Sequence, residues 1–299
     1  MGYSGDMTKN PKLHSPQPTA RPGDQPDFSY IELSDAGAVD RPPTDAPVRE
    51  IEHLATEMVR VLDDDHQAVG PWAPELEPET LLGALEIMVL TRAYDERMLR
   101  IQRQGKISFY IQALGEEAVS VGPGLAFEKD DMMFPAYRNQ GLYIMRGTGL
   151  VDMMCQCLSN TRDMCKGRQM PIFYHNRENN VFSISGNLTT QYPQAVGWAM
   201  GAAIKGEDNI AVSWIGDGST AEADFHHALT FAAVYNAPVV LNVSNNQWAI
   251  SSFQGFAGGE RRSFAARGPG YGMPGIRVDG NDLLATYAVS RWAAERARS

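Results

Sequence analysis

The clearest alternation of apolar and polar residues predicts a strand, a helix and a second strand in the last third of the chain. Residues 210–215 form a short apolar run, typical of a strand buried on both faces. A Gly-Asp-Gly turn at 216–218 interrupts it, and residues 239–243 form a second such run. Between them, apolar residues recur with helical spacing at Phe225, Ala228, Leu229 and Ala232. The pattern predicts one βαβ unit, whose parallel strands are joined by a right-handed crossover.

The helix of this unit is expected to begin directly after the glycine turn and to end before Pro238. Ser219 or Thr220 is suited to cap its first N–H groups. Two acidic residues, Glu222 and Asp224, fall in the first turn, where the helix dipole favours negative charge. The start of the helix would therefore present free N–H groups to an anion such as a phosphate.

A polar residue follows each of the two predicted strands. Asp217 follows the first strand and Asn246 follows the second, within the pair Asn245-Asn246. Parallel strands end at the same edge of a sheet, and ligands of open α/β sheets bind at that edge. A carboxylate, an amide oxygen and a diphosphate form a set of hard oxygen ligands suited to octahedral Mg²⁺. The sequence therefore predicts a magnesium-diphosphate site.

Similar patterns predict the remaining elements. Helices are expected at 78–104, from 116 onwards, at 151–158, at 192–204 and at 283–298, and short strands at 132–134, 182–185 and 276–278. The segment 106–112 is either a strand or an extended turn, and 50–62 is a short helix or a hairpin. Gly197 and Gly201 give the helix at 192–204 a small-residue face. Such a face allows close packing across a subunit interface or against a sheet.

Residues 1–48 are rich in proline and are expected to form an extended arm, disordered or laid over a partner. Its apolar island, residues 28–33, is either a docking segment or part of a flexible tail. Residues 49–299 are expected to form the α/β domain.

Composition excludes several classes of protein. The net charge of −10 and the pI of about 5.1 argue against a surface for nucleic acids or anionic membranes. No apolar run approaches the ~20 residues of a membrane span, and the N-terminus lacks a signal-peptide pattern. Cys155, Cys157 and Cys165 form neither an even set nor a Cys-x-x-Cys motif, so reduced thiols are expected. These features indicate a cytoplasmic protein.

The turn at 216–218, followed after 26 residues by Asn245-Asn246, resembles the thiamin-diphosphate motif. The resemblance implies that Asp217, Asn246 and the backbone carbonyl of Trp248 hold Mg²⁺. It also implies that Gly216, Gly218 and Ser219 contact the cofactor.

Four further segments resemble the α subunits of the branched-chain 2-oxo acid dehydrogenase E1 component. They are residues 166–171, 247–251, 268–272 and 277–282. The resemblance implies an α/β thiamin-diphosphate-binding fold, with a mostly parallel sheet flanked by helices on both faces. The implied activity is oxidative decarboxylation of branched-chain 2-oxo acids, with acyl transfer to the lipoyl group of E2. The implied assembly is an α₂β₂ heterotetramer with an E1 β subunit.

Two alternatives remain open at this stage. Pyruvate and acetoin dehydrogenase α subunits share the cofactor motif and vary in the flanking segments. A truncated chain that binds cofactor or β subunit without turnover is the other alternative. In the family, the α subunit continues past position 299 with a histidine-containing loop that closes the active site. None of the six histidines of this chain matches that histidine, and the glutamate that activates the cofactor belongs to the β subunit.

The resemblance assigns roles to further residues. Tyr137 and Arg138 are expected to contact the diphosphate, and Phe109 and Tyr137 to line the pocket for the acyl chain. Leu188 would support the folded cofactor from below, while the carbonyl of Gly186 accepts a hydrogen bond from its amino group. A structural monovalent cation such as K⁺ is expected on Ser185, Asn187, Thr190 and Gln191. Ser244 departs from the arginine that animal members carry near the diphosphate.

Overall fold

A three-stranded parallel sheet lies at the centre of the computed structural model, which describes residues 13–299. Its strands are β2 (Met132–Phe134), β3 (Ala211–Gly216) and β4 (Val239–Ser244), in the order β2-β3-β4. β3 and β4 are in register from their first residues to their last, where Gly216 pairs with Ser244. The parallel βαβ unit expected from the sequence is confirmed, and α6 (Ala223–Tyr235) is its connecting helix.

Helices cover both faces of this sheet. Alternate residues of β3 point to opposite sides, and apolar residues on both sides need a covering layer. Ala211 and Ile215 pack with α5 (Gln191–Lys205) and α6 in one hydrophobic cluster. Val212 and Trp214 belong to a second cluster on the opposite face. That cluster contains residues of α1 (Pro78–Arg103), α3 (Gln140–Met145), α4 (Leu150–Cys157) and α8 (Leu283–Arg298). The α/β architecture with a parallel sheet between helices is therefore confirmed.

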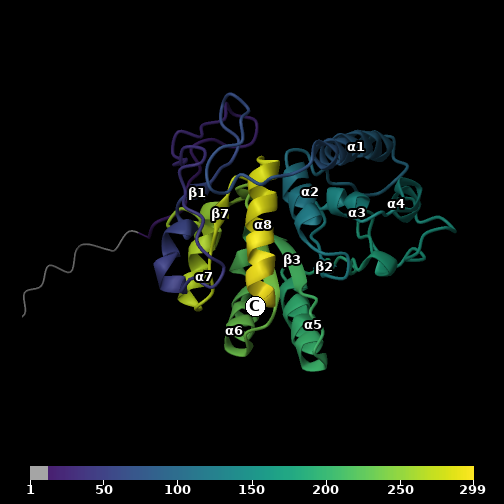
Figure 1. Ribbon diagram of the computed structural model, residues 1–299. Helices are drawn as coiled ribbons and strands as arrows, with labels where there is room; N and C mark the ends of the chain where they lie inside the picture. Colours follow the sequence, from purple (N-terminus) through teal and green to yellow (C-terminus); the bar gives the residue numbers. More distant parts are fainter. Residues whose placement is uncertain (1–12) are drawn as a thin grey trace, which may run out of the picture.

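Several helices begin and end at the residues that the sequence indicates. α1 has Pro78 in its first turn, and Gly105, with a φ of +71°, follows its end. Asp282 caps α8 through its side chain, which accepts a hydrogen bond from the N–H of Ala285 at 2.9 Å. α2 (Glu117–Ala126) begins at the expected Gly-Glu-Glu sequence. In Figure 1, α8 crosses the middle of the molecule between α1–α4 and the segment that contains β1, β7 and α7.

Smaller elements complete the fold. β1 (Met58–Val59) pairs in parallel with β7 (Arg277–Val278), and β5 (Trp248–Ala249) pairs antiparallel with β6 (Ser252–Phe253). Short helical turns are η1 (Val48–Glu50), η2 (Glu52–Ala55), η3 (Arg177–Asn179), η4 (Gly218–Ala221), η5 (Gln254–Ala257), η6 (Phe264–Ala266) and α7 (Arg267–Gly270). No helix of the described residues combines the length and apolar character needed to cross a bilayer.

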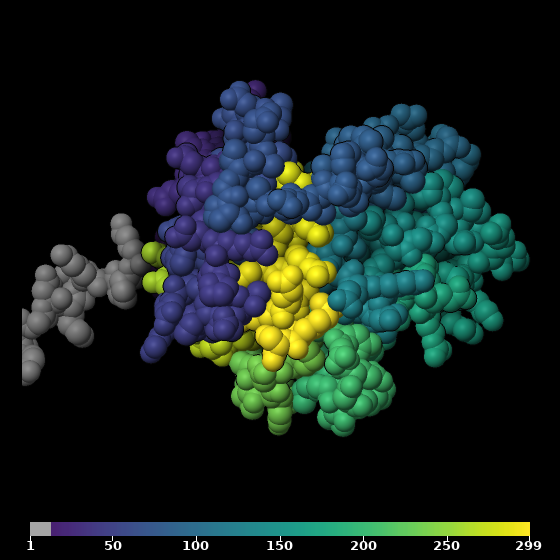
Figure 2. Space-filling view, in the orientation of Figure 1, coloured from purple at the N-terminus to yellow at the C-terminus, as the bar shows by residue number. Residues whose placement is uncertain are grey.

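The described part of the N-terminal arm is extended and lies against its own chain (Figure 2). Trp292 of α8 donates a hydrogen bond from Nε1 to the carbonyl of Pro42 at 2.8 Å, and Trp72 donates to that of Asp40 at 3.2 Å. Val39 and Ala46 are buried in the same cluster as these two tryptophans. The apolar island keeps Phe28 and Leu33 more than half exposed, while residues 1–12 of the expected arm lie outside the described part.

The prediction of a strand at 182–185 is wrong. Val181 forms only isolated bridges, one with Met133 of β2 and one with Asn176, and Phe182 then donates its N–H to the Met133 carbonyl at 2.8 Å. Asn180 adopts a left-handed conformation with a φ of +54°, so the chain meets the edge of β2 at a bend. Beyond it, the N–H of Ile184 bonds to Tyr174 in an irregular segment, so no ladder extends along β2.

The helix of the βαβ unit begins later than expected, and neither Ser219 nor Thr220 caps it. The 3₁₀ turn η4 comes first, and α6 begins after Glu222, whose side chain makes no capping bond. The chain turns into η4 directly at Asp217, so both hydroxyl residues lie inside that turn. Thr220 Oγ1 donates to the carbonyl of Asp217 at 2.7 Å instead.

The glycine face of α5 is open within this chain. A Cβ atom built at Gly197 or Gly201 would meet nothing within 4 Å, and Ile204 on the same helix is 84% exposed. The opposite face, which carries Ala195 and Ala199, is fully buried against the sheet. Packing of the two glycines against this sheet is therefore excluded, and packing across a subunit interface stays a prediction.

Candidate functional site

The ends of β3 and β4 bring the two polar motifs to one edge of the sheet. Because Gly216 pairs with Ser244, the backbone of Asp217 continues the ladder and its N–H donates to the Ser244 carbonyl at 3.2 Å. Gly218 then passes so close to β5 that a Cβ there would overlap the Cβ of Ala249. The glycine after Asp217 is therefore required by this close approach.

Asp217 is a buried carboxylate with an unused oxygen. Its residue is 2% exposed, and Oδ2 has no hydrogen-bond partner among the described residues. Burial, with a smaller contribution from nearby Glu116, raises the pKa of Asp217 to about 6, while the backbone N–H groups of Asp217 and Gly218 oppose the shift. A buried acceptor without a donor is costly, and a bound cation would satisfy it.

Asn246 extends from the end of β4 toward the same place. Its Oδ1 accepts a hydrogen bond from the N–H of Trp248 at 3.1 Å, which forms a tight turn. Its Nδ2 donates to Oε1 of Glu116 at 2.9 Å. Glu116 thus contacts Asn246 and acts electrostatically on Asp217, so all three side chains belong to one neighbourhood.

Glu116 is a residue of this neighbourhood that the sequence does not reveal, since the Gly-Glu-Glu stretch indicates only the start of a helix. Its carboxyl is largely buried, and burial raises its pKa while the Asn246 amide and Arg138 lower it. The sequence offers one local signal for a role other than capping: glutamate is not among the residues preferred at the N-cap position of a helix, which Glu116 occupies.

Arg138 lies beside Glu116, between β2 and α3. Its Nη1 donates to the carbonyl of Gln112 at 2.6 Å, and its Nε lies 3.6 Å from Glu116 Oε1. The guanidinium also lies over the ring of Tyr137, 5.7 Å from the centroid. Its side chain is one third exposed, so its positive charge stays partly accessible to an anionic ligand.

The segment 106–112 contains no strand; it bends at 106–108 and is irregular from 109 to 112. Phe109 and Tyr137 are half-buried and pack against the same hydrophobic cluster. Asp95 of α1 anchors this segment, accepting hydrogen bonds from Tyr110 Oη at 2.6 Å and from the N–H of Ala113 at 2.5 Å. Burial raises the pKa of Asp95 to about 6, although these two hydrogen bonds oppose the shift.

The loop before α5 lies next to the glycine turn. Thr189, buried and with a φ of +69°, donates from Oγ1 to the carbonyl of Ser219 at 2.6 Å. Gly186 and Leu188 are exposed, with Leu188 at 49%. Thr189 thus links the loop that carries Gly186 and Leu188 to the turn where the diphosphate is expected. The sequence does not indicate this contact.

The expected monovalent-cation residues form a compact oxygen-rich turn in the same loop. Thr190 Oγ1 donates to the carbonyl of Asn187 at 3.0 Å, and the N–H of Asn187 donates to Ser185 Oγ at 3.2 Å. Gln191 is buried, and its Oε1 has no partner among the described residues. The turn therefore contains a second unused buried acceptor.

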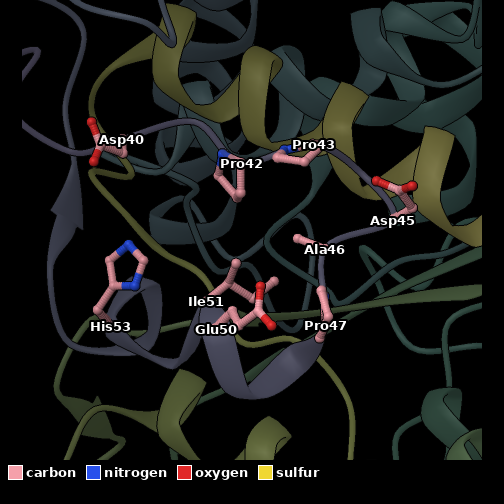
Figure 3. A pocket seen from close by; sticks show the side chains of 9 residues that line it. All are labelled: Asp40, Pro42, Pro43, Asp45, Ala46, Pro47, Glu50, Ile51 and His53. Atoms are coloured by element: carbon pink, nitrogen blue, oxygen red, sulfur yellow. The ribbon is translucent and has the colours of Figure 1, made fainter.

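A hollow elsewhere in the molecule is separate from this edge of the sheet (Figure 3). It lies between the arm and η1–η2, and its lining residues are Asp40, Pro42, Pro43, Asp45, Ala46, Pro47, Glu50, Ile51 and His53. It includes none of the residues expected to bind the cofactor.

Comparison with known proteins places the chain in a family. The model of the dehydrogenase E1 component family matches residues 85–299, and that of the N-terminal region of 2-oxoisovalerate dehydrogenase E1 α subunits matches residues 9–48. The 2-oxoisovalerate dehydrogenase α subunit of Pseudomonas aeruginosa is 60% identical over 96% of this chain and 70% of its own length. The mitochondrial α subunits of Dictyostelium discoideum and Homo sapiens are 41% and 39% identical, over 74% and 80% of this chain. This chain covers about half the length of those two relatives, 50% and 54%. The chain belongs to the dehydrogenase E1 component family, with 2-oxoisovalerate dehydrogenase α subunits among its relatives.

Proposed function

We propose that the chain is the α part of a thiamin-diphosphate-dependent E1 component. This component decarboxylates branched-chain 2-oxo acids oxidatively and passes the acyl group to the lipoyl group of E2. The observation that carries the proposal is the unpartnered, buried Oδ2 of Asp217 at the edge of the sheet, next to Asn246. The 60% identity to a protein named 2-oxoisovalerate dehydrogenase subunit alpha supports the substrate class.

The donor set fits Mg²⁺ bound to a diphosphate. Asp217 Oδ2, Asn246 Oδ1 and the Trp248 carbonyl would contribute three hard oxygens, and the diphosphate would add others. Gly216, Gly218 and Ser219 would lie along the diphosphate. The exposed part of the Arg138 guanidinium would pair with one of its phosphate groups, and Tyr137 would contact it from the same turn.

Thiamin diphosphate, when bound, supplies the carbon nucleophile and the electron sink that decarboxylation requires. The residues of this chain bind and orient it. Leu188, half-exposed, would support the folded cofactor, and the Gly186 carbonyl would accept from its amino group. Phe109 and Tyr137 would line the acyl pocket and exclude water from it.

The proposed assembly includes an E1 β subunit in an α₂β₂ heterotetramer, and a lipoylated E2 as acceptor. The open glycine face of α5 supports a subunit contact. We also propose that Ser185, Asn187, Thr190 and Gln191 hold K⁺, which would satisfy the Gln191 oxygen. The 1–48 and 49–299 division, the thiamin-diphosphate-binding fold and the cytoplasmic location belong to the same proposal.

The proposal is tested by titrating the chain, assembled with its β subunit, with thiamin diphosphate and Mg²⁺. Decarboxylation of 3-methyl-2-oxobutanoate is then measured, with pyruvate as the comparison substrate. Saturable dependence on both additives and a preference for the branched substrate are expected. Turnover that depends on neither additive would refute the cofactor assignment, and a preference for pyruvate would refute the substrate class.

A further inference from the structure

Two adjacent glutamates at the start of α2 have different partners. Glu117 is buried, its Oε2 accepts from the N–H of Gly115 at 3.0 Å, and its Oε1 accepts from Arg92 of α1. Glu117 therefore ties the helix start to α1. Glu116 stands at the N-cap position of α2 but makes no capping bond. Its side chain reaches instead to Asn246, which is 130 positions away in the sequence.

The contact with Glu116 selects one orientation of the Asn246 amide. A carboxylate can only accept hydrogen bonds, whereas an amide has one donating end and one accepting end. With Nδ2 donating to Glu116 at 2.9 Å, Oδ1 is directed away from that carboxylate. A flipped amide would bring two acceptors together and lose a charge-assisted hydrogen bond to Glu116, whose side chain is 17% exposed. Glu116 therefore favours the same orientation as the Trp248 N–H, which donates to Oδ1 and leaves the second lone pair of that oxygen for a cation.

Pairing with Arg138 alone does not account for this placement. The closest approach of Arg138 Nε to Glu116 is 3.6 Å, longer than an ordinary charge-assisted hydrogen bond. Arg138 is already held by the Gln112 carbonyl at 2.6 Å. By contrast, Glu116 is the one hydrogen-bond partner of Asn246 Nδ2 in residues 13–299. Asn246 depends on this contact more than Arg138 does.

We propose that Glu116 is a positioning residue, which holds the Asn246 amide with its oxygen turned toward the Mg²⁺ of the cofactor complex. The inference rests on the proposed function, because it presupposes that Asn246 is a ligand. Glu116 itself stays outside the ligand set and acts through Asn246. Partners of this kind, behind a metal ligand, typically change metal affinity by about 10- to 100-fold.

The test uses Glu116→Ser and Glu116→Gln in the chain assembled with its β subunit. Serine is favoured at helix N-caps but is too short to reach Asn246, so this variant is expected to fold with a melting temperature near that of the wild type. Glutamine keeps an acceptor oxygen at the same reach. Calorimetry measures the Mg²⁺ concentration required for half-saturation with thiamin diphosphate. We expect it to rise about 10-fold in Glu116→Ser and less than about 3-fold in Glu116→Gln.

A double-mutant cycle with Asn246→Ala separates positioning from a general structural effect. If Glu116 acts through Asn246, Glu116→Ser changes the Mg²⁺ requirement little when Asn246 is already alanine. Equal Mg²⁺ requirements in wild type and Glu116→Ser, or a full additional loss in the double variant, would overturn the proposal. Glu96→Ala, which removes an exposed partner of Arg100 on α1, is the matched control and should behave as wild type.

The design also distinguishes this inference from the proposed function. Suppose that the wild type binds the cofactor, that Asp217→Asn loses this binding and that Glu116→Ser keeps it unchanged. This result would retain the proposed function and reject the positioning role of Glu116. Absence of Mg²⁺-dependent binding in the wild type would reject both.

Discussion

The backbone N–H of Asp217 donates to the carbonyl of Ser244 across the ends of β3 and β4, at 3.2 Å. This bond continues the six-residue ladder that sets the relation between two motifs far apart in the sequence. It aligns the glycine turn after β3 with the asparagine pair after β4, because the strands are parallel and in full register. Both motifs therefore lie where the ladder ends, which is the usual ligand-binding edge of an α/β sheet.

Replacing Asp217 with asparagine is expected to remove cofactor binding while the fold persists. The variant keeps the size of the side chain but loses the charge that would balance Mg²⁺. We expect the affinity for Mg²⁺ with thiamin diphosphate to fall at least ~100-fold, equivalent to about 3 kcal/mol. Calorimetry on the assembled enzyme measures it. Asp224→Asn, on the exposed first turn of α6, is the control, and equal affinities in both variants would contradict the assignment of Asp217.

Gly218→Ala is expected to destabilise the chain because the new methyl group would overlap that of Ala249. Overpacking of this kind costs about 1–3 kcal/mol. The free energy of unfolding in urea should therefore decrease, and Ala249→Gly in the same chain should restore much of it. Gly216→Ala is the matched control, since a Cβ there meets nothing within 4 Å. If Gly216→Ala and Gly218→Ala lower the free energy of unfolding by similar amounts, the close approach to β5 is not the cause of the destabilisation.

The stability of the chain is expected to depend on pH through Asp95. Its pKa is raised to about 6 by burial, so in the folded state it holds a proton that the unfolded state releases near pH 4. Its contribution to stability is therefore fully present below about pH 4 and is lost as the pH rises through about 6. At 1.36 kcal/mol per pKa unit, the loss amounts to about 3 kcal/mol.

The measurement compares urea unfolding of wild type and Asp95→Asn between pH 4.5 and 7.5, values chosen around the pKa of about 6. The difference in unfolding free energy between the two proteins should shift in favour of the variant as the pH rises, whatever constant cost the substitution has. Asp64→Asn changes a fully exposed carboxyl and should leave the profile unchanged. Parallel profiles for wild type and Asp95→Asn would contradict the raised pKa.

Local sequence patterns predicted the elements that depend on neighbouring residues. The strands of the βαβ unit and the start of α8 at Asp282 follow from short apolar runs and a capping residue. The start of α6 was missed because the Thr220 hydroxyl bonds back to Asp217 within a 3₁₀ turn. The pattern at 182–185 predicts a strand, but the left-handed Asn180 next to β2 turns the chain away.

The missed site residues share a different cause. Glu116 bonds to Asn246 across 130 positions, and Thr189 bonds to Ser219 across 30. Neither partner can be identified from residues nearby in the sequence, because the contacts exist only after β3, β4 and α2 have packed. Sequence patterns therefore place Asp217 and Asn246 at one edge of the sheet, because each directly follows a strand, but they do not indicate the contacts of Glu116 and Thr189.

The arm is expected to be anchored by Trp292. Its Nε1 donates to the Pro42 carbonyl at 2.8 Å, and its ring lies in the cluster that also buries Val39. Trp292→Phe removes the donor and leaves a smaller ring in a buried position, so a cost of at least about 1 kcal/mol is expected. Hydrogen exchange should become faster at amides 44–51, where the N–H of Ala46 bonds to Pro43. Trp198→Phe on α5 is the control, and equal acceleration in both variants would contradict a specific anchor.

Gln191 is expected to make the stability of the chain depend on K⁺. Its buried Oε1 lacks a donor among the described residues, and the Asn187 carbonyl and the Ser185 hydroxyl lie in the same turn. A ligand that binds only the folded state raises its stability with concentration. The melting temperature should therefore rise when K⁺ replaces choline at constant ionic strength. Gln191→Met, similar in length but without the amide oxygen, should lose this response, whereas Gln194→Met on the exposed side of α5 should keep it. An equal response to K⁺ in all three proteins would mean that the unused oxygen of Gln191 is satisfied in another way.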